Sequence, residues 1–175
     1  DGYDIDEGIE FARALDGKVD IIHISAGNHE VQEAMIITHP SMFLEDGCNL
    51  QYAAAIKKHV KAHVATVGAF TDPAHMEEIV ASGQADIIQM GRQTMADPFL
   101  PAKARDGRDD EITKCMRCSA CFGNVGRHRI FYCAVNPVVG HEDEARYLPP
   151  VREKKNVLVV GGGVAGMQAA LTASE

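Results

Sequence analysis

The sequence lacks a long apolar run, an excess of basic charge and an even set of cysteines, and each absence excludes a class of protein. No apolar stretch approaches the roughly 18 residues of a membrane span, so we expect no membrane partner. Lys and Arg number 17 against 25 Asp and Glu, which gives a net charge of −8 and argues against nucleic acid as a partner. Five cysteines are an odd number for a secreted disulfide scaffold and indicate a reduced, cytoplasmic compartment.

What the sequence contains suits a folded globular protein. Its 175 residues are 46% hydrophobic and 24% charged, which argues against disorder. A chain of this length makes one domain or pieces of two. The N-terminus is acidic and begins without Met, so we expect no secretory signal there.

Residues 1–105 alternate between helical and strand-like patterns. We expect helices at 7–15, 49–61, 73–82 and 98–105, and apolar strands at 19–27, 63–70 and 85–92. Asp6 and Asp72 are the expected N-caps of the first and third helices, with Pro73 at the first helical position. The segment 28–47 is expected to be a long functional loop. Helices between strands imply parallel strands with helical crossovers.

Three apolar strands with covering helices fit part of a (β/α) barrel, and an open doubly wound sheet is the alternative. Residues 106–150 lose the periodicity, carry four cysteines and end in two prolines. Residues 151–175 restart with an expected strand at 156–160, a glycine turn and a helix. Because a lone strand and helix cannot bury their apolar faces, we expect the chain to be a fragment of a longer protein.

Four cysteines form the strongest chemical pattern. Cys115, Cys118 and Cys121 lie within seven residues, and Cys133 follows after eleven more. Four thiolates ligate a [4Fe–4S] cluster or a structural zinc ion. Zinc sites more often use two separated pairs, so the spacing favours the cluster over zinc or unligated thiols. The flanking basic residues can offset the negative charge of a cluster, or form a solvated basic loop: Lys114, Arg117, Arg127 and Arg129.

A second pattern lies between the expected strand and helix near the C-terminus. Gly161, Gly163 and Gly166 fit G-x-G-x-x-G, in which the backbone approaches a pyrophosphate at a helix N-terminus. The acidic residue that contacts a ribose is expected about 20 positions on, beyond Glu175, so FAD and NAD(P) are not separated. A glycine turn without a ligand is the alternative.

The ends of the expected strands supply further candidates. Gly68 and Ala69 end one strand, and Gly91 and Arg92 end the next. In barrels a phosphate often binds there on backbone N–H groups, where glycine leaves room and arginine adds a forked charge. The alternatives are turn glycines and a surface ion pair. His29 follows the first strand and can donate a proton near neutral pH, although a loop histidine without a catalytic role is the alternative.

These pieces together resemble the iron–sulfur flavoenzymes related to old yellow enzyme, which include 2,4-dienoyl-CoA reductase, 2-enoate reductase and trimethylamine dehydrogenase. The resemblance rests on VDIIHISAGNHE, VATVGAFTDP, ADIIQMGRQTMADP, the C-x2-C-x2-C-x11-C segment and NVLVVGGGVAGMQAA. It implies an α/β fold in three parts. Residues 1–105 would be the last three units of an FMN-binding (β/α)8 barrel, 106–150 a [4Fe–4S] segment and linker, and 151–175 the start of a Rossmann-like domain.

The resemblance also implies roles for the candidate residues. The two strand ends fall where the family holds the FMN phosphate, and the four cysteines fall on its cluster ligands. The three glycines fall on the fingerprint for FAD, or for the ADP moiety of another dinucleotide. His29 falls where dienoyl-CoA reductases carry an active-site histidine. In such an enzyme NAD(P)H is the electron donor, and electrons reach FMN through the cluster.

The activity implied is reduction of the C=C bond of an α,β-unsaturated carbonyl, such as an enoate, a dienoyl-CoA or a steroid enone. We therefore expect a small-molecule substrate, and a homo-oligomer as the assembly. The spacing of the second and third cysteines is closer to enoate reductases and amine dehydrogenases than to dienoyl-CoA reductases. An amine dehydrogenase is thus one alternative, and a zinc-stabilised binding module is an alternative of another class.

Overall fold

The protein is described from a computed structural model, which covers residues 2–125, 130–146 and 153–174. The chain divides into two compact units, residues 1–142 and 143–175, and each is described by itself. The expected divisions after residues 105 and 150 stay predictions. The elements in chain order are α1 (Ile5–Leu15), β1 (Ile21–Ile24), α2 (Gln32–Thr38), α3 (Leu50–Lys57), β2 (His63–Val67), α4 (Pro73–Ala81), β3 (Ile87–Gln89), α5 (Arg92–Ala96), α6 (Leu100–Arg105), a 3-10 turn (Asp109–Glu111), α7 (Ala120–Val125), α8 (Glu142–Arg146) and α9 (Val164–Ser174).

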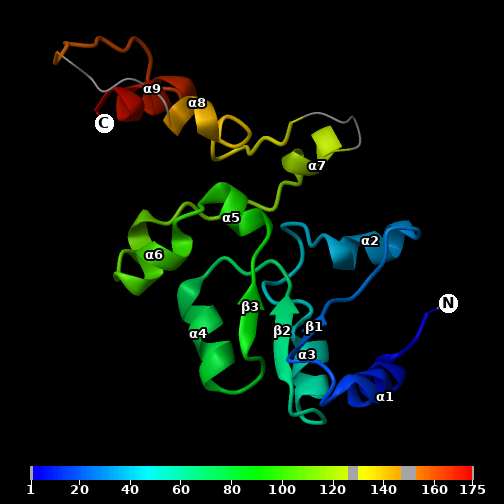
Figure 1. Ribbon diagram of the computed structural model, residues 1–175. Coiled ribbons are helices and arrows are strands. Elements are labelled where there is room, and N and C mark those ends of the chain that lie inside the picture. Colours follow the sequence, from blue (N-terminus) through cyan, green and yellow to red (C-terminus); the bar gives the residue numbers. More distant parts are fainter. Residues whose placement is uncertain (1, 126–129, 147–152, 175) are drawn as a thin grey trace. The chain divides into compact units, whose positions relative to one another are not determined.

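A parallel sheet in the order β1-β2-β3 organises the first unit (Figure 1). Ile21 pairs with His63, and Ala65 pairs with Ile87, so all three strands run the same way. α3 connects β1 to β2 and α4 connects β2 to β3. The prediction of a mixed α/β fold with three parallel strands and helical crossovers is confirmed.

The strands are shorter than the apolar runs that predicted them. β2 ends at Val67, and Ala69 two residues later has a φ of 62°, which belongs to the left-handed region and breaks the ladder. β3 keeps only Ile87–Gln89 before Gly91 turns the chain into α5. The apolar runs therefore continue past the strands into the turns at their carboxyl ends.

One of the two predicted N-caps is observed in the structure, and the other is not. At α4, Asp72 accepts a hydrogen bond from the backbone N–H of Ala74 at 3.0 Å, and Pro73 is the first helical residue, as predicted. The N-cap of α1 is Asp4 rather than Asp6, so that prediction is wrong. Asp4 and Glu7 form a reciprocal capping box, which binds the backbone N–H groups of Asp4, Asp6 and Glu7.

The segment 28–47 is not a loop throughout, because it contains α2. Before this helix, the side-chain oxygen of Asn28 accepts hydrogen bonds from the backbone N–H groups of Glu30 and Val31 at 3.1 and 2.9 Å. This turn leads the chain into α2, and seven residues separate this helix from the end of β1. The expectation of a twenty-residue structureless loop is therefore wrong, and α2 instead lies near the carboxyl ends of the strands (Figure 1).

Two apolar clusters form the core of the first unit. One joins α1, β1, α3 and β2, with Ala53 and Val64 fully buried. The other joins α4 to the segment after β2 and to α6, through Ile79, Phe70 and Leu100. The two clusters pack helices against the sheet and so fix the segments that follow β2 and β3.

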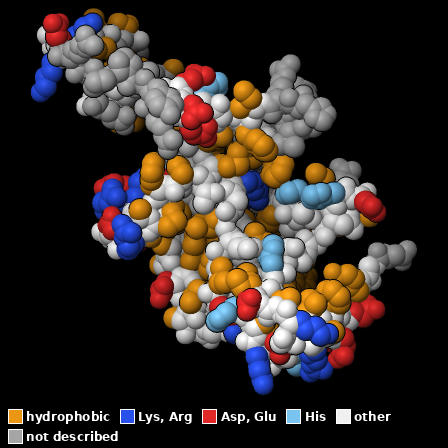
Figure 2. Space-filling model, viewed as in Figure 1, with side chains coloured by type: hydrophobic (Ala, Val, Ile, Leu, Met, Phe, Trp, Pro, Cys, Tyr) orange, Lys and Arg blue, Asp and Glu red, His pale blue; other side chains and the backbone are white. Residues whose placement is uncertain are grey.

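The described residues of the second unit form helices and no strand. The strand expected at 156–160 is not formed, because a strand needs a hydrogen-bonded neighbour and the described part of this unit supplies none. Leu158 and Val160 are 87% and 89% exposed. Hydrophobic side chains are also common on the visible surface of the molecule (Figure 2). In the described residues, no helix has both the length and the apolar character to cross a membrane.

Candidate functional site

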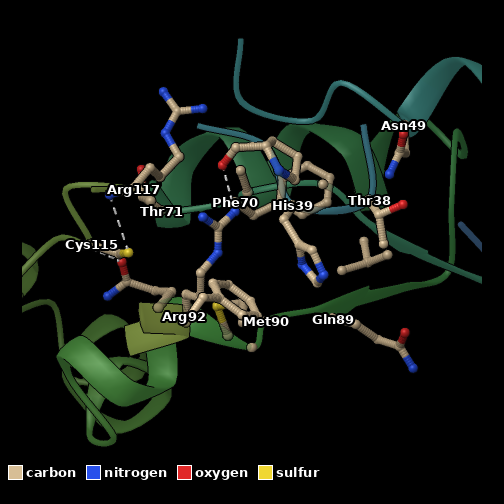
Figure 3. Close-up of a pocket in the computed structure, with 17 residues that line it drawn as sticks. Thr38, His39, Asn49, Phe70, Thr71, Gln89, Met90, Arg92, Cys115 and Arg117 are labelled. Carbon is tan, nitrogen blue, oxygen red and sulfur yellow. Dashed lines mark hydrogen bonds between the residues drawn. The ribbon is translucent and has the colours of Figure 1, made fainter. Parts of the chain in front are cut away.

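A cavity of about 290 Å³ lies at the carboxyl ends of β2 and β3 (Figure 3). Its walls come from the segments after both strands, the end of α2, the start of α3 and the cysteine-bearing segment. The lining residues are 38–40, Asn49, 67–71, 89–93, Cys115, Arg117 and Phe122. The structure therefore brings the four candidate phosphate-site residues, Gly68, Ala69, Gly91 and Arg92, into one cavity.

The two glycines of this cavity differ in how closely other atoms pack against them. A Cβ on Gly68 would lie 3.1 Å from the backbone nitrogen of Asn49, and the carbonyl of Gly68 accepts from the N–H of Gly47 at 2.6 Å. Gly68 thus lets the turn before α3 pack on the end of β2. A Cβ on Gly91 would meet no atom within 4 Å. In the described residues, no contact of the protein itself requires glycine at position 91. The space where a side chain would lie is open and adjoins the cavity.

Arg92 is held with its guanidinium in the cavity wall. Its Nη2 donates to the carbonyl of Pro40 at 2.5 Å, and its Cζ lies 5.9 Å from the ring centroid of Phe122. Nη1 reaches Ser119 Oγ at 3.5 Å. No carboxylate in the described ranges pairs with Arg92, so these ranges give the surface ion-pair alternative no support. The charge of Arg92 is available to an anion.

His29 does not line the cavity, whereas His39 does. The Nε2 atoms of the two histidines are 3.0 Å apart and the rings stack with centroids 4.9 Å apart. The ring of His39 also lies 4.3 Å from that of Phe122. Burial, followed by the charges of His29 and Arg92, lowers the pKa of His39. His39 was not among the predicted site residues, although its place in the long connection after the first strand was a usable signal.

The four predicted cysteine ligands line one small pocket: Cys115, Cys118, Cys121 and Cys133. All four are free thiols. Arg92 and Cys115 line this pocket and the cavity as well, so the two sites share a wall. Burial raises the pKa of Cys121, and the neighbouring Cys115 raises it further. A metal that binds such thiols must displace their protons.

The chemistry of the donor set fits an iron–sulfur cluster. In the described part of the chain, no three His, Cys, Asp or Glu side chains are arranged around a single metal ion. One zinc ion, with Zn–S bonds of about 2.3 Å, needs sulfurs within about 4 Å of one another. A cluster of four irons takes four thiolates, which is compatible with the four cysteines that line one pocket.

The loop between the cysteines has an unusual backbone. Arg117 and Ser119 have φ values of 53° and 58°, a left-handed conformation that costs about 1–3 kcal/mol for a residue other than glycine. The backbone N–H of Arg117 points at Cys115 Sγ, with nitrogen and sulfur 3.4 Å apart. Such N–H groups stabilise thiolate ligands and tune the metal centre. The strained backbone of this loop therefore brings an N–H group to Cys115 Sγ. Contacts elsewhere in the fold must offset the free-energy cost of the strain.

Gln93 and Asp97 hold the start of this loop. Gln93, only 3% exposed, donates to the carbonyl of Thr113 at 3.0 Å and accepts from the N–H of Cys115 at 2.8 Å. Asp97 accepts from the N–H of Thr113 at 3.0 Å and from the ammonium of Lys103 at 2.6 Å. Although burial raises the pKa of Asp97, these hydrogen bonds outweigh it and the pKa lies below its usual range.

Replacing Gln93 by alanine is expected to loosen the segment that carries Cys115. The change leaves the carbonyl of Thr113 and the N–H of Cys115 unpaired, and each costs about 1–3 kcal/mol. Amide hydrogen exchange of residues 113–115 in the full-length protein should therefore rise about tenfold or more. Gln84→Ala, at an exposed hydrogen bond to Ser82, is the matched control and should change nothing there. Equal exchange in both variants would contradict the anchoring role.

The basic residues near the cysteines have partners of their own. Lys114 pairs with Asp72 at 3.2 Å, and Arg117 pairs with Asp46 at the same distance. Their charges are thus partly neutralised before any cluster binds. Arg127 and Arg129 lie outside the described residues.

The glycine turn of the second unit forms directly before α9. Gly161 has a φ of 118°, and a Cβ on Gly166 would collide with the carbonyl oxygen of Gly161. The N–H of Met167 donates to the carbonyl of Gly163 at 2.9 Å at the start of the helix. The turn therefore requires glycine at its first and last fingerprint positions. Its dinucleotide ligand stays a prediction.

Comparison with known proteins identifies relatives of the chain. The profile of the NADH:flavin oxidoreductase / NADH oxidase family matches residues 12–111. The chain is 41% identical to NADH oxidase from Thermoanaerobacter brockii and 35% identical to cinnamate reductase from Clostridium sporogenes. Each match covers 99% of this chain, against 27% and 26% of the relative.

Solved structures of related enzymes share the fold. A complex of 2-naphthoyl-CoA reductase with 2-naphthoyl-CoA matches with a TM-score of 0.84 and 35% identity, over 94% of this chain and 25% of that one. The 6-hydroxypseudooxynicotine amine oxidase of Pseudomonas geniculata N1 matches with a TM-score of 0.83 and 31% identity, over 95% and 25%. The chain spans about a quarter of the length of its relatives.

Proposed function

Because the chain belongs to the NADH:flavin oxidoreductase / NADH oxidase family, we propose that it is part of an NAD(P)H-dependent enzyme that reduces the C=C bond of an α,β-unsaturated carbonyl compound. Within it, the first unit would supply the last three units of an FMN-binding (β/α)8 barrel. The second unit would begin the domain that binds FAD or the ADP moiety of another dinucleotide. A cytoplasmic location and a homo-oligomeric assembly remain expectations.

One observation carries this proposal, namely that the two strand ends meet in a single cavity with an arginine that pairs with no carboxylate among the residues the structure describes. The open space beside Gly91 and the guanidinium of Arg92 suit a phosphate group. We assign the FMN phosphate to Arg92 and to the backbone N–H groups at positions 68–69 and 91–92. When bound, FMN supplies hydride transfer and a [4Fe–4S] cluster supplies single-electron transfer.

The protein's own groups have separate tasks in this scheme. The four cysteines hold the cluster, while Gln93 and Asp97 keep their loop in shape. Arg92 fixes the cofactor phosphate on one side of the wall shared with the cysteine pocket. His29, the predicted catalytic residue, reaches the cavity only through its contact with His39.

An anaerobic assay of the full-length protein tests the function. With cinnamate and an enoyl-CoA as probes, we expect one NAD(P)H consumed for each saturated product, identified by a mass gain of two hydrogens. The similarity to an amine oxidase favours the second candidate, an amine dehydrogenase. Oxidation of dimethylamine or trimethylamine with an artificial electron acceptor, without any NAD(P)H-dependent reduction of either alkene, would establish that alternative and overturn the proposal.

A further inference from the structure

We propose that His39 and His29 form a proton relay that connects solvent to the cavity, with His39 as the group that protonates the bound substrate. This inference rests on the proposed function. The juxtaposition that carries it is a histidine in the cavity wall in contact, through Nε2, with an exposed histidine.

The geometry sets the direction in which a proton passes through the two rings of the relay. His29 is exposed and its Nε2 lies 3.0 Å from Nε2 of His39, within hydrogen-bond distance. No hydrogen bond joins Nδ1 of His39 to any residue in the described ranges. A proton can therefore pass from solvent to His29, enter His39 at Nε2 and leave it at Nδ1.

The surroundings hold His39 in this position. Phe122 packs on one side of its ring at 4.3 Å, and the stacked ring of His29 lies 4.9 Å away. The charged and titratable groups on the other walls of the cavity are Arg92, Arg117 and Cys115. Burial, followed by the positive charges of His29 and Arg92, lowers the pKa of His39, so its protonated form is a stronger acid than a free imidazolium.

The hydride that adds to the β-carbon belongs to the proposed function. The N–H bond of protonated His39 breaks, its electron pair stays on nitrogen, and a C–H bond forms at the α-carbon. His39 is left neutral with its remaining proton on Nε2. After this proton moves to Nδ1 by tautomerisation, Nε2 takes a proton from His29, which takes one from water. The carbonyl compound is reduced by two electrons and gains one hydride and one proton.

The test uses the full-length protein with His39→Gln, His29→Gln and the control His63→Gln. His63 lies at the opposite end of β2 from the cavity. In stopped-flow, the oxidation of reduced enzyme by cinnamate should slow about 10²- to 10⁴-fold in His39→Gln, as for loss of a general acid. His29→Gln should slow it less, and added imidazole should restore part of the rate. The control should equal the parent.

Two readouts separate a relay from a structural role. First, the solvent deuterium isotope effect on this step should rise in His29→Gln. Second, NMR titration of the imidazoles should show a higher pKa for His39 in His29→Gln, because a positive neighbour is gone. A rate, isotope effect and His39 pKa unchanged in His29→Gln would overturn the relay. If the parent reduces no alkene, the proposed function fails instead.

Discussion

Replacing Arg92 by alanine is expected to lower the affinity for FMN by about tenfold to more than a hundredfold. A charged hydrogen bond contributes about 1.5–3 kcal/mol, and each 1.4 kcal/mol is a factor of ten. In the full-length protein, Arg92→Ala should therefore lose FMN on dialysis while it keeps iron. Arg92→Lys should recover only part of the affinity, because a point charge cannot reproduce the guanidinium fork.

Riboflavin, which lacks the phosphate, is the internal control for this prediction. Arg92 also donates to the carbonyl of Pro40, so its loss can loosen the cavity wall without any phosphate being involved. If the arginine binds phosphate, the affinity for riboflavin should fall much less than the affinity for FMN. Equal losses for both flavins would assign Arg92 to the Pro40 contact, and the phosphate site would then rest on backbone groups alone.

Removing one cysteine of the shared pocket is expected to abolish the iron content of the protein. The anaerobically purified parent should contain about four irons and four sulfides per chain. Cys121→Ala removes a thiolate that no other described side chain replaces, so iron and sulfide should fall close to zero. Metal and acid-labile sulfide analysis, with the visible absorbance of the cluster, measures the result.

Cys48 provides the matched control for this experiment. It is also a partly buried free thiol, but it does not line the cysteine pocket. Cys48→Ala should keep the full complement of iron. Stoichiometric zinc without sulfide in the parent would reject the cluster and favour the zinc-stabilised binding module.

The local features of this protein were largely predictable from its sequence. An Asp followed by a Pro favours the start of a helix, with Asp as the N-cap and Pro at the first helical position. Asp72 and Pro73 occupy these positions at the start of α4. The parallel strands followed from short apolar runs separated by helices. Cys115, Cys118 and Cys121 are close together because they lie within seven residues, with Cys121 in the first turn of α7, and only the approach of Cys133 needed the fold.

Other features could not be predicted from the sequence pattern, and the reasons are physical. The strand at 156–160 has the composition of a buried strand, yet strand formation depends on a neighbour that the described part of its unit lacks. Gln93 and Asp97 look like ordinary polar helix residues in the sequence. Their burial and their hydrogen bonds to residues 113–115 arise only when α5 packs beneath the cysteine loop.

The sequence by itself determined which chemistry this protein can support, because thiols, flexible glycines and a cationic fork are properties of residue types and short spacings. The tertiary structure decided which of these groups meet. It placed Arg92 against Pro40 across 52 positions of sequence, in the wall shared by the cavity and the cysteine pocket. It also placed His39, which follows directly after α2, in the cavity wall, whereas His29 lies before α2 and is exposed.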